Sequence, residues 1–191
     1  AARAAAGDAA ASDDSTITVA SYNIRTASAW AERDGGDGAY GRTWARRRDG
    51  VRRSVELSGA TVVGTQEGLA RQCDDLTELL GEAWRRVGRG RVGDGSDDDE
   101  TASILYDSSR LELVASGDYW LSDTPDRPSK AWGAALPRLV TWASFADWQR
   151  RAFHVVNAHF DHASAEARLR SAEALRRRRF AATPRVSTEY P

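Results

Sequence analysis

The sequence predicts a layered α/β fold around one hydrophobic core. The first half of the chain alternates strand patterns with helix patterns, and the part from Trp84 onward consists mainly of short runs rich in β-branched and apolar residues. A length of 191 residues with a hydrophobic share of 41% is sufficient for one core of ordinary size. We therefore expect helices packed on β-sheet within a single folded domain.

The first predicted strand and helix precede Gly59. Residues 15–24, STITVASYNI, carry β-branched residues at alternate positions and predict a strand that ends close to Asn23. A loop rich in Gly, Asp and Arg follows to about Thr43. Beyond it, apolar side chains recur on one face of a predicted helix that Gly59 can end. These side chains are Trp44, Val51 and Val55.

A second strand and helix pair follows directly. Residues 60–67, ATVVGTQE, form a short apolar run that predicts a buried strand. Helical spacing then returns in residues 73–80, and Gly81 can end that helix. The side chains with this spacing are Cys73, Leu76, Leu79 and Leu80.

The second half is predicted to be mostly antiparallel strands. The runs are AWRRVGRG (83–90), TASILYD (101–107), LELVASGDYWL (111–121), LVTWASF (139–145) and FHVVNAHF (153–160). Residues 93–100, GDGSDDDE, are too acidic and glycine-rich to be other than a surface loop, and prolines break the long connection 122–137. A final helix is expected within 163–180, with Leu169, Ala172 and Leu175 roughly in line.

Composition and charge exclude several classes of protein. The formal net charge is -1, so the chain lacks the overall positive field of a non-specific nucleic-acid coat protein. No apolar run approaches the roughly 20 residues that span a bilayer, which excludes an integral membrane segment. Every basic residue except Lys130 is an arginine, a side chain suited to forked contacts with phosphate. The single cysteine, Cys73, cannot form an internal disulfide.

The first fourteen residues are predicted to be a flexible leader. Residues 1–14, AARAAAGDAAASDD, are small and polar and lack any bulky apolar side chain. Such a segment is typical of the sequence that follows a cleaved signal, which predicts an extracellular protein, with a cytoplasmic location as the alternative. Residues 15–191 form the predicted domain.

Polar side chains stand where predicted strands end. Asn23 follows the first strand and Glu67 closes the second, and open sheets place their ligand crevice at such ends. In NAHFDH, Asn157, His159 and Asp161 alternate and so share one face of an extended chain. Each of these residues taken singly is equally consistent with a structural role, as a solvated turn or as a cap of the strand.

Five motifs in order resemble the endonuclease/exonuclease/phosphatase superfamily, in its bacterial branch of Mg-dependent phosphoesterases. The motifs are SYNIR, VVGTQEGL, ILYDSSRLELVASGDYWLSDTP, WGAALPR and NAHFDH. The resemblance extends from about Thr16 to Leu175. It implies a four-layer α/β/β/α sandwich of the DNase I-like type, of which residues 15–191 would be the N-terminal two-thirds.

The resemblance also implies roles for particular residues. Glu67 matches the metal-binding glutamate, and Asn23 matches an asparagine that orients the metal site and a phosphate oxygen, so both are expected at a Mg²⁺ ion, with Mn²⁺ as an alternative. His159 matches a histidine that contacts the scissile phosphate. Arg138 is similar to an arginine that faces the phosphate, and Glu100 resembles a carboxylate that orients the histidine.

The remaining expectations concern the substrate and its surroundings. Asn157 and Asp161 are expected near the substrate, and Arg25 is a further candidate for neutralising its phosphate. Hydrolysis of a phosphate ester needs a hard cation and cationic donors on the phosphoryl oxygens, which these residue types can provide. The substrate could be a phosphorylated small molecule, a phospholipid headgroup or a nucleic acid, and we expect a monomer.

One departure from the family bears on activity. The superfamily closes its site with a Gly-Asp-Phe-Asn strand end and a final Asp-His pair, and neither follows His159 in this sequence. This predicts a fold without its C-terminal strands and an impaired hydrolase, since a general base contributes about 10²–10⁴-fold. An inactive phosphate-binding or protein-binding module is the alternative. A glycoside hydrolase that uses Glu67 and Glu100, with some of the seven tryptophans stacking on sugars, is a third hypothesis.

Overall fold

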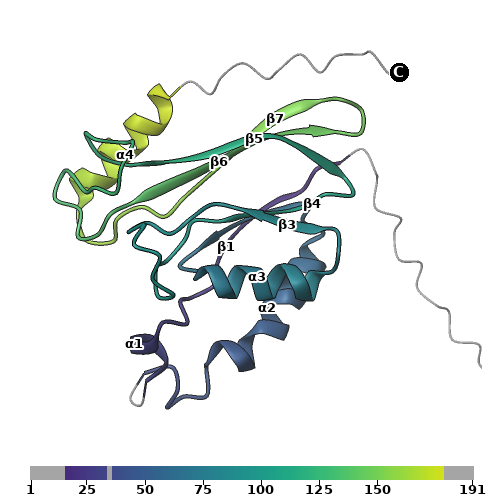
Figure 1. Cartoon of the computed structure of the whole chain (residues 1–191), viewed down its shortest axis with the longest axis horizontal. Helices are drawn as coiled ribbons and strands as arrows, with labels where there is room; N and C mark the ends of the chain where they lie inside the picture. Colours follow the sequence, from purple (N-terminus) through teal and green to yellow (C-terminus); the bar gives the residue numbers. More distant parts are fainter. Residues whose placement is uncertain (1–15, 34–35, 179–191) are drawn as a thin grey trace, which may run out of the picture.

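The computed structural model describes residues 16–33 and 36–178 as two β-sheets packed face to face with helices outside them (Figure 1). Both the predicted leader, residues 1–14, and the last residues, 179–191, lie outside these ranges. The elements in chain order are β1 (Val19–Asn23), α1 (Ala29–Glu32), α2 (Trp44–Ser58), β2 (Val62–Gln66), α3 (Ala70–Leu80), β3 (Trp84–Val87), β4 (Ile104–Asp107), β5 (Leu111–Trp120), β6 (Leu139–Asp147), β7 (Ala152–Ala158) and α4 (Ala165–Arg177). The predicted α/β layering is confirmed.

The first sheet has the strand order β1-β2-β4-β3. β1 and β2 are parallel because α2 crosses between them, whereas β4 runs antiparallel to both β2 and β3. α2 and α3 lie together on one face of this sheet (Figure 1) and bury the apolar stripes that the sequence predicts. As predicted, Gly59 and Gly81 end these helices, and both have positive φ angles that a glycine adopts without strain.

The second sheet contains β5, β6 and β7 in sequence order, and all its pairings are antiparallel. A register shift between Leu113 and Ala115 marks a bulge in β5. α4 covers the outer face of this sheet, where Leu175 packs against a cluster that includes Tyr119 and Val140 (Figure 1). The layers therefore run helix, sheet, sheet, helix.

The two sheets meet in an apolar core whose side chains come from both. Val62, Ile104 and Tyr106 of the first sheet pack against Leu111, Ala143, Phe145 and Val155 of the second. The rings of Tyr106 and Phe145 are 5.0 Å apart. Asn157 adds a polar link, because its Nδ2 donates to the carbonyl oxygens of Thr65 and Ser103 across the interface. Gly64 leaves the space for it, since a Cβ there would lie 2.9 Å from the Asn157 side chain.

Three details differ from the sequence-based expectations. The short helix α1 lies within the predicted loop before Thr43. β7 ends at Ala158, so NAHFDH leaves the strand after its second residue. On α4, Leu169 is 59% exposed, and the buried face carries Ala167 and Ser171 instead. Leu169 lies about 200° around the helix from Ala167 and so points away from the sheet, whereas Leu175 of the predicted line packs against the second sheet. No helix in the described ranges is both long and apolar enough to cross a membrane.

Candidate active site

Several predicted site residues converge at one end of the sandwich. Glu67 follows β2, Glu100 precedes β4, Arg138 precedes β6 and His159 follows β7. Together with Arg91, these four residues line a narrow cavity of about 10 Å³, which is roughly the space of one water molecule. It adjoins a wider cavity of about 170 Å³ that the same side chains share with Arg25, Trp30, Leu136 and His162. We call the two cavities together the active pocket.

Glu67 is held by its neighbour on the adjacent strand. Nδ2 of Asn23 donates to Oε1 of Glu67 over 2.8 Å, and Oδ1 of Asn23 accepts from the backbone N–H of Arg25 over 3.0 Å. Both polar atoms of the Asn23 amide are therefore engaged with protein, and Asn23 orients the glutamate. Glu67 and Arg25 have φ angles of 62° and 59°, a left-handed conformation that costs about 1–3 kcal/mol for such residues. Backbone strain of this kind is typical of functional sites.

A buried glutamine joins the two loops that carry these strained residues. Gln72, on α3, accepts hydrogen bonds through Oε1 from the backbone N–H groups of Ala27 and Leu69. Its Nε2 donates to the carbonyl oxygen of Arg25 over 3.0 Å. Gln72 therefore fixes the loop after β1 to the loop after β2, and with them the positions of Arg25 and Glu67. The sequence analysis did not identify this residue, although a polar side chain beside Cys73 on the apolar helix face was a usable indication.

Glu100 pairs with an arginine that the sequence analysis also missed. Nη1 of Arg91 lies 2.6 Å from Oε2 of Glu100. Burial raises the pKa of Glu100; the charge of Arg91 opposes this rise, and the nearby Glu67 carboxylate adds to it. The resemblance implied that Glu100 orients His159, but in the structure the carboxylate bonds to Arg91. Arg91 belongs to the glycine-rich stretch before the acidic loop, where nothing in the local pattern distinguishes it from the other arginines.

His159 presents a neutral ring to the pocket. Its Nδ1 atom is buried and has no hydrogen-bond partner within the described part of the chain. Burial lowers the pKa of His159, and the positive charge of Arg138 lowers it further. Because Nδ1 is enclosed, Nε2 is the ring nitrogen that can meet a ligand in the cavity. A buried ring nitrogen without a partner is unusual in a folded protein, and His159 is therefore a candidate functional residue.

Arg138 is almost fully buried and is held in place by Asp161. Nε of Arg138 lies 3.2 Å from Oδ2 of Asp161, and Nη2 lies 2.9 Å from Nδ1 of His162. The other oxygen of Asp161 accepts from the backbone N–H groups of Ala163 and Ser164. The structure thus places Asp161 behind the arginine and gives it the geometry of a positioning group. Asn157 is not part of the pocket lining, because it lies between the sheets.

The donor set of the pocket fits a magnesium ion. No group of three or more His, Cys, Asp and Glu side chains with metal-binding geometry occurs among residues 16–33 and 36–178. Mg²⁺ does not need one, since it is commonly held by one or two carboxylates together with water and substrate oxygens. Glu67 and Glu100 line the same narrow cavity, and their mutual repulsion there would be relieved by a cation.

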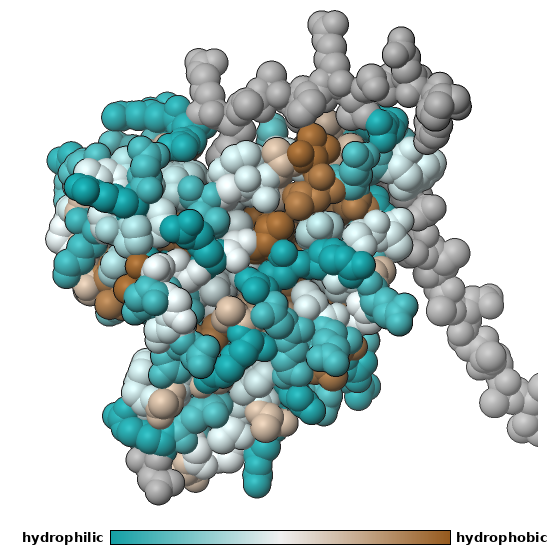
Figure 2. All heavy atoms as spheres, in the orientation of Figure 1, coloured by the Kyte–Doolittle hydropathy of each residue, from teal (hydrophilic) through white to brown (hydrophobic). Residues whose placement is uncertain are grey.

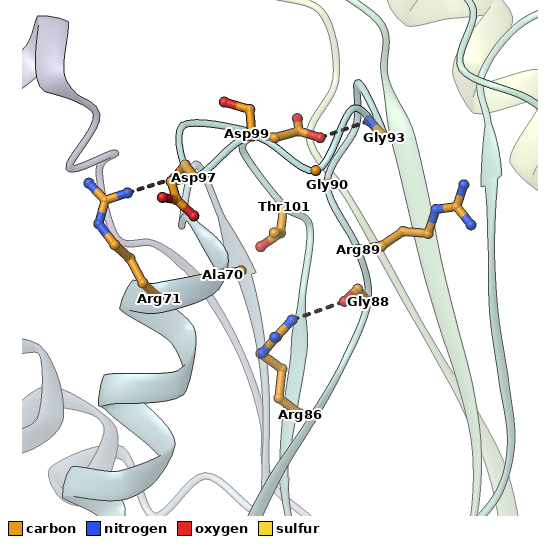
Figure 3. A pocket seen from close by; sticks show the side chains of 12 residues that line it. Ala70, Arg71, Arg86, Gly88, Arg89, Gly90, Gly93, Asp97, Asp99 and Thr101 are labelled. Atoms are coloured by element: carbon orange, nitrogen blue, oxygen red, sulfur yellow. Dashed lines mark hydrogen bonds between the residues drawn. The ribbon is translucent and has the colours of Figure 1, made fainter.

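A larger cavity of about 580 Å³ lies beside the pocket and shares Thr101 with it. Figure 3 shows that its cationic side chains are already bonded to protein: Nη1 of Arg71 donates to the carbonyl oxygen of Asp97, and Nη1 of Arg86 donates to that of Gly88. Arg89 points out of this cavity in the same view and stacks on Trp120. The unpaired buried nitrogen and the strained backbone are both found at the active pocket, which is therefore the better candidate site.

Several solved structures are similar to this chain over most of its length. Two structures from Bacteroides thetaiotaomicron, an endonuclease/exonuclease/phosphatase family protein and a mannosyl-6-phosphatase, are 37% and 36% identical to this chain, with TM-scores of 0.76 and 0.75. A family protein from Bacteroides vulgatus is 32% identical, with a TM-score of 0.74. Each match covers 84% of this chain, and this chain spans 56–59% of the length of those structures.

These likenesses confirm the resemblance to the endonuclease/exonuclease/phosphatase superfamily and its four-layer fold. No protein-family model matches the sequence, and no curated protein matches it either. These three solved structures are one phosphatase and two proteins of a family that includes nucleases and phosphatases.

Proposed function

We propose that the protein hydrolyses a phosphate ester with the help of Mg²⁺ bound at Glu67, with Glu100 nearby. The observation that carries this proposal is the convergence of Glu67, Arg138 and His159, which are far apart in sequence, on one cavity. Two carboxylates alone would also suit hydrolysis of a glycosidic bond. The arginines of the pocket favour a phosphate ester as the substrate instead. Mg²⁺, when bound, would polarise a phosphoryl oxygen and lower the pKa of a bound water.

Several side chains of the pocket bind the phosphoryl group or orient the groups that bind it. Arg138 keeps a fixed orientation through Asp161 and offers its positive charge to the phosphoryl oxygens. Nε2–H of the neutral His159 ring donates to the same group, and Asn23 keeps the Glu67 carboxylate directed into the cavity. Preorganised donors of this kind stabilise the charge that develops in the transition state.

A phosphomonoester is the favoured substrate class. One of the similar structures, at 36% identity, is a mannosyl-6-phosphatase. The pocket also suits a terminal phosphate, because Arg138 and His159 line both cavities and the wider one leaves room for a leaving group. Nucleic acid is less favoured, since a net charge of -1 supplies no extended positive surface for a long polyanion.

The proposal is tested by phosphate release from mannose 6-phosphate with Mg²⁺. Glu67→Gln removes the anchoring charge and is expected to lower kcat/KM by about 10²-fold or more, because the cation would lose its charged ligand. Glu82→Gln, at an exposed position away from the pocket, is the matched control and should retain the wild-type rate. Equal rates for wild type and Glu67→Gln would contradict the proposal. Binding without turnover by the wild type would instead favour the inactive phosphate-binding module.

A further inference from the structure

Trp30 is an exposed aromatic side chain at the mouth of the active pocket. Its side chain is 56% exposed, and it lines the wider cavity together with Leu136. The guanidinium carbons of Arg25 and Arg33 lie 6.0 and 5.9 Å from the centre of its ring, within the range of a cation–π interaction. A large aromatic ring left open to solvent beside a polar cavity is typical of a binding surface.

Short-range structure fixes the position of this ring. Trp30 lies on α1, whose next residue, Ala31, is buried, and the backbone N–H groups of Ala31 and Glu32 donate to the carbonyl oxygen of Ser28. Oε1 of Glu32 in turn bonds to the backbone N–H of Trp44 at the start of α2. The short helix is therefore anchored at both ends, although its tryptophan stays outside the core. Core packing does not account for Trp30 as it does for the largely buried Trp120.

We propose that Trp30 is the platform on which the sugar ring of a sugar monophosphate stacks while its phosphate contacts Arg138 and His159 in the wider cavity. This inference rests on the proposed function, and it adds the residue that selects the leaving group. A sugar ring has an apolar C–H face that packs on an aromatic ring, and its hydroxyl groups can bond to charged side chains of the lining, such as Arg25. Trp30 and the arginines of the pocket then contact the same sugar phosphate.

The lining of the pocket favours one sugar over a nucleic-acid strand. Proteins that bind single strands use several aromatic platforms along a positively charged groove. In the described ranges, Trp30 is the single Trp, Tyr or Phe residue of the lining, and Glu67 and Glu100 share that lining with the arginines. The wider cavity of about 170 Å³ is small, as expected for one ring rather than for a chain of nucleotides.

The experiment compares binding of mannose 6-phosphate with binding of glycerol 3-phosphate, a monoester without a ring, by titration calorimetry. We expect the wild type to bind the sugar phosphate about tenfold more tightly, because one stacked ring adds roughly that much affinity. Trp30→Ala should abolish the difference by weakening the binding of mannose 6-phosphate alone, and Trp30→Phe should restore part of it. Trp148→Ala, which removes a tryptophan of similar exposure (55%) outside the pocket lining, should behave as wild type.

The outcomes separate this inference from the proposed function. Loss of affinity for both ligands to the same degree in Trp30→Ala, or no change for either, would overturn the stacking role, as would a wild type that binds neither ligand. Because the assay measures binding, a chain that binds the sugar phosphate through Trp30 but releases no phosphate would uphold the platform while contradicting hydrolysis. In a turnover assay, the platform predicts a KM for mannose 6-phosphate that rises in Trp30→Ala with little change in kcat.

Discussion

The Asp161 carboxylate is the residue on which the orientation of Arg138 depends. Burial by itself would raise the pKa of Asp161, but hydrogen bonds from the backbone N–H groups of Ser164 and Ala163 and from Arg138 outweigh it and hold that pKa far below its usual range. The carboxylate is thus charged in the folded protein at any ordinary pH. Its charge compensates the Arg138 guanidinium, which is itself only 3% exposed.

Asp161→Asn should therefore destabilise the fold and change its pH dependence. Removing one partner of a buried ion pair costs about 3–5 kcal/mol, because the other charge stays buried without compensation. The contribution of Asp161 is fully present above its unfolded-state pKa, near pH 4, and is lost as the pH falls through the lower folded-state pKa. The wild type should lose stability below about pH 4 more steeply than Asp161→Asn, as measured by urea unfolding at several pH values.

The matched control for this prediction is Asp126→Asn, a substitution of an exposed aspartate in the long connection before β6. Its stability and its pH dependence should follow those of the wild type to within about 0.5 kcal/mol. If Asp161→Asn unfolded with the same free energy as this control, the ion pair would not hold Arg138 in the manner described.

At the scale of elements, the site depends on two loops that α3 holds together. The helix itself was predictable, since Cys73 and Leu76 recur at helical spacing and both are buried against the first sheet. What the pattern did not show is that Gln72, on the same buried face, bonds to the backbone of both loops. The active pocket is thereby coupled to the packing of α3.

Gln72→Leu tests this coupling with a side chain of similar size. It leaves two N–H groups and one carbonyl oxygen without their partner, and the free energy of unfolding should fall by about 2–4 kcal/mol because buried polar groups are costly when unpaired. Urea denaturation measures this change, and phosphate release should fall with it as Glu67 loses its fixed position. Gln149→Leu, in the exposed turn between β6 and β7, is the control and should leave both quantities unchanged. Wild-type stability in Gln72→Leu would show that the loops hold their positions without it.

At the scale of the whole molecule, the two sheets form one body through their shared core. Phe145 of β6 is fully buried and contacts side chains of both sheets, including Tyr106. The surface is more mixed: Figure 2 shows a group of hydrophobic residues on one face, next to residues of intermediate hydropathy and hydrophilic ones. Val19 of β1 and Val156 of β7 are exposed, and both line a cavity of about 140 Å³ between the sheets. Within the described ranges, β1 and β7 each pair on one side only, so these strands are the edges of their sheets.

Phe145→Ala should lower the free energy of unfolding of both sheets together rather than of one layer. Replacing a buried phenylalanine with alanine costs about 3–5 kcal/mol, which combines the lost burial with the cavity that remains. Chemical denaturation followed by fluorescence and by circular dichroism should give a single transition shifted to lower denaturant for both signals. Leu57→Ala, at a position 77% exposed on α2, is expected to change stability by less than about 0.5 kcal/mol. Separate transitions of the two sheets in Phe145→Ala would contradict a shared core.

The NAHFDH motif shows how far the sequence could predict the candidate site. Alternation suggested one shared face for Asn157, His159 and Asp161, but the strand ends at Ala158 and the three side chains enter different surroundings. Asn157 joins the sheets, His159 faces the pocket and Asp161 holds Arg138. Alternation describes a strand, and it loses its meaning once the chain leaves the sheet.

Local pattern alone determined the order of the elements apart from α1, and the two strand ends near Asn23 and Glu67. These follow from side-chain periodicity and from glycine at helix ends, which depend only on neighbours in the chain. The tertiary structure alone decided that Arg91 pairs with Glu100, that Gln72 fixes the strained loops and that Trp30 remains exposed beside the pocket. Such contacts join residues from separate elements, and their geometry exists only after the sheets and helices have packed together.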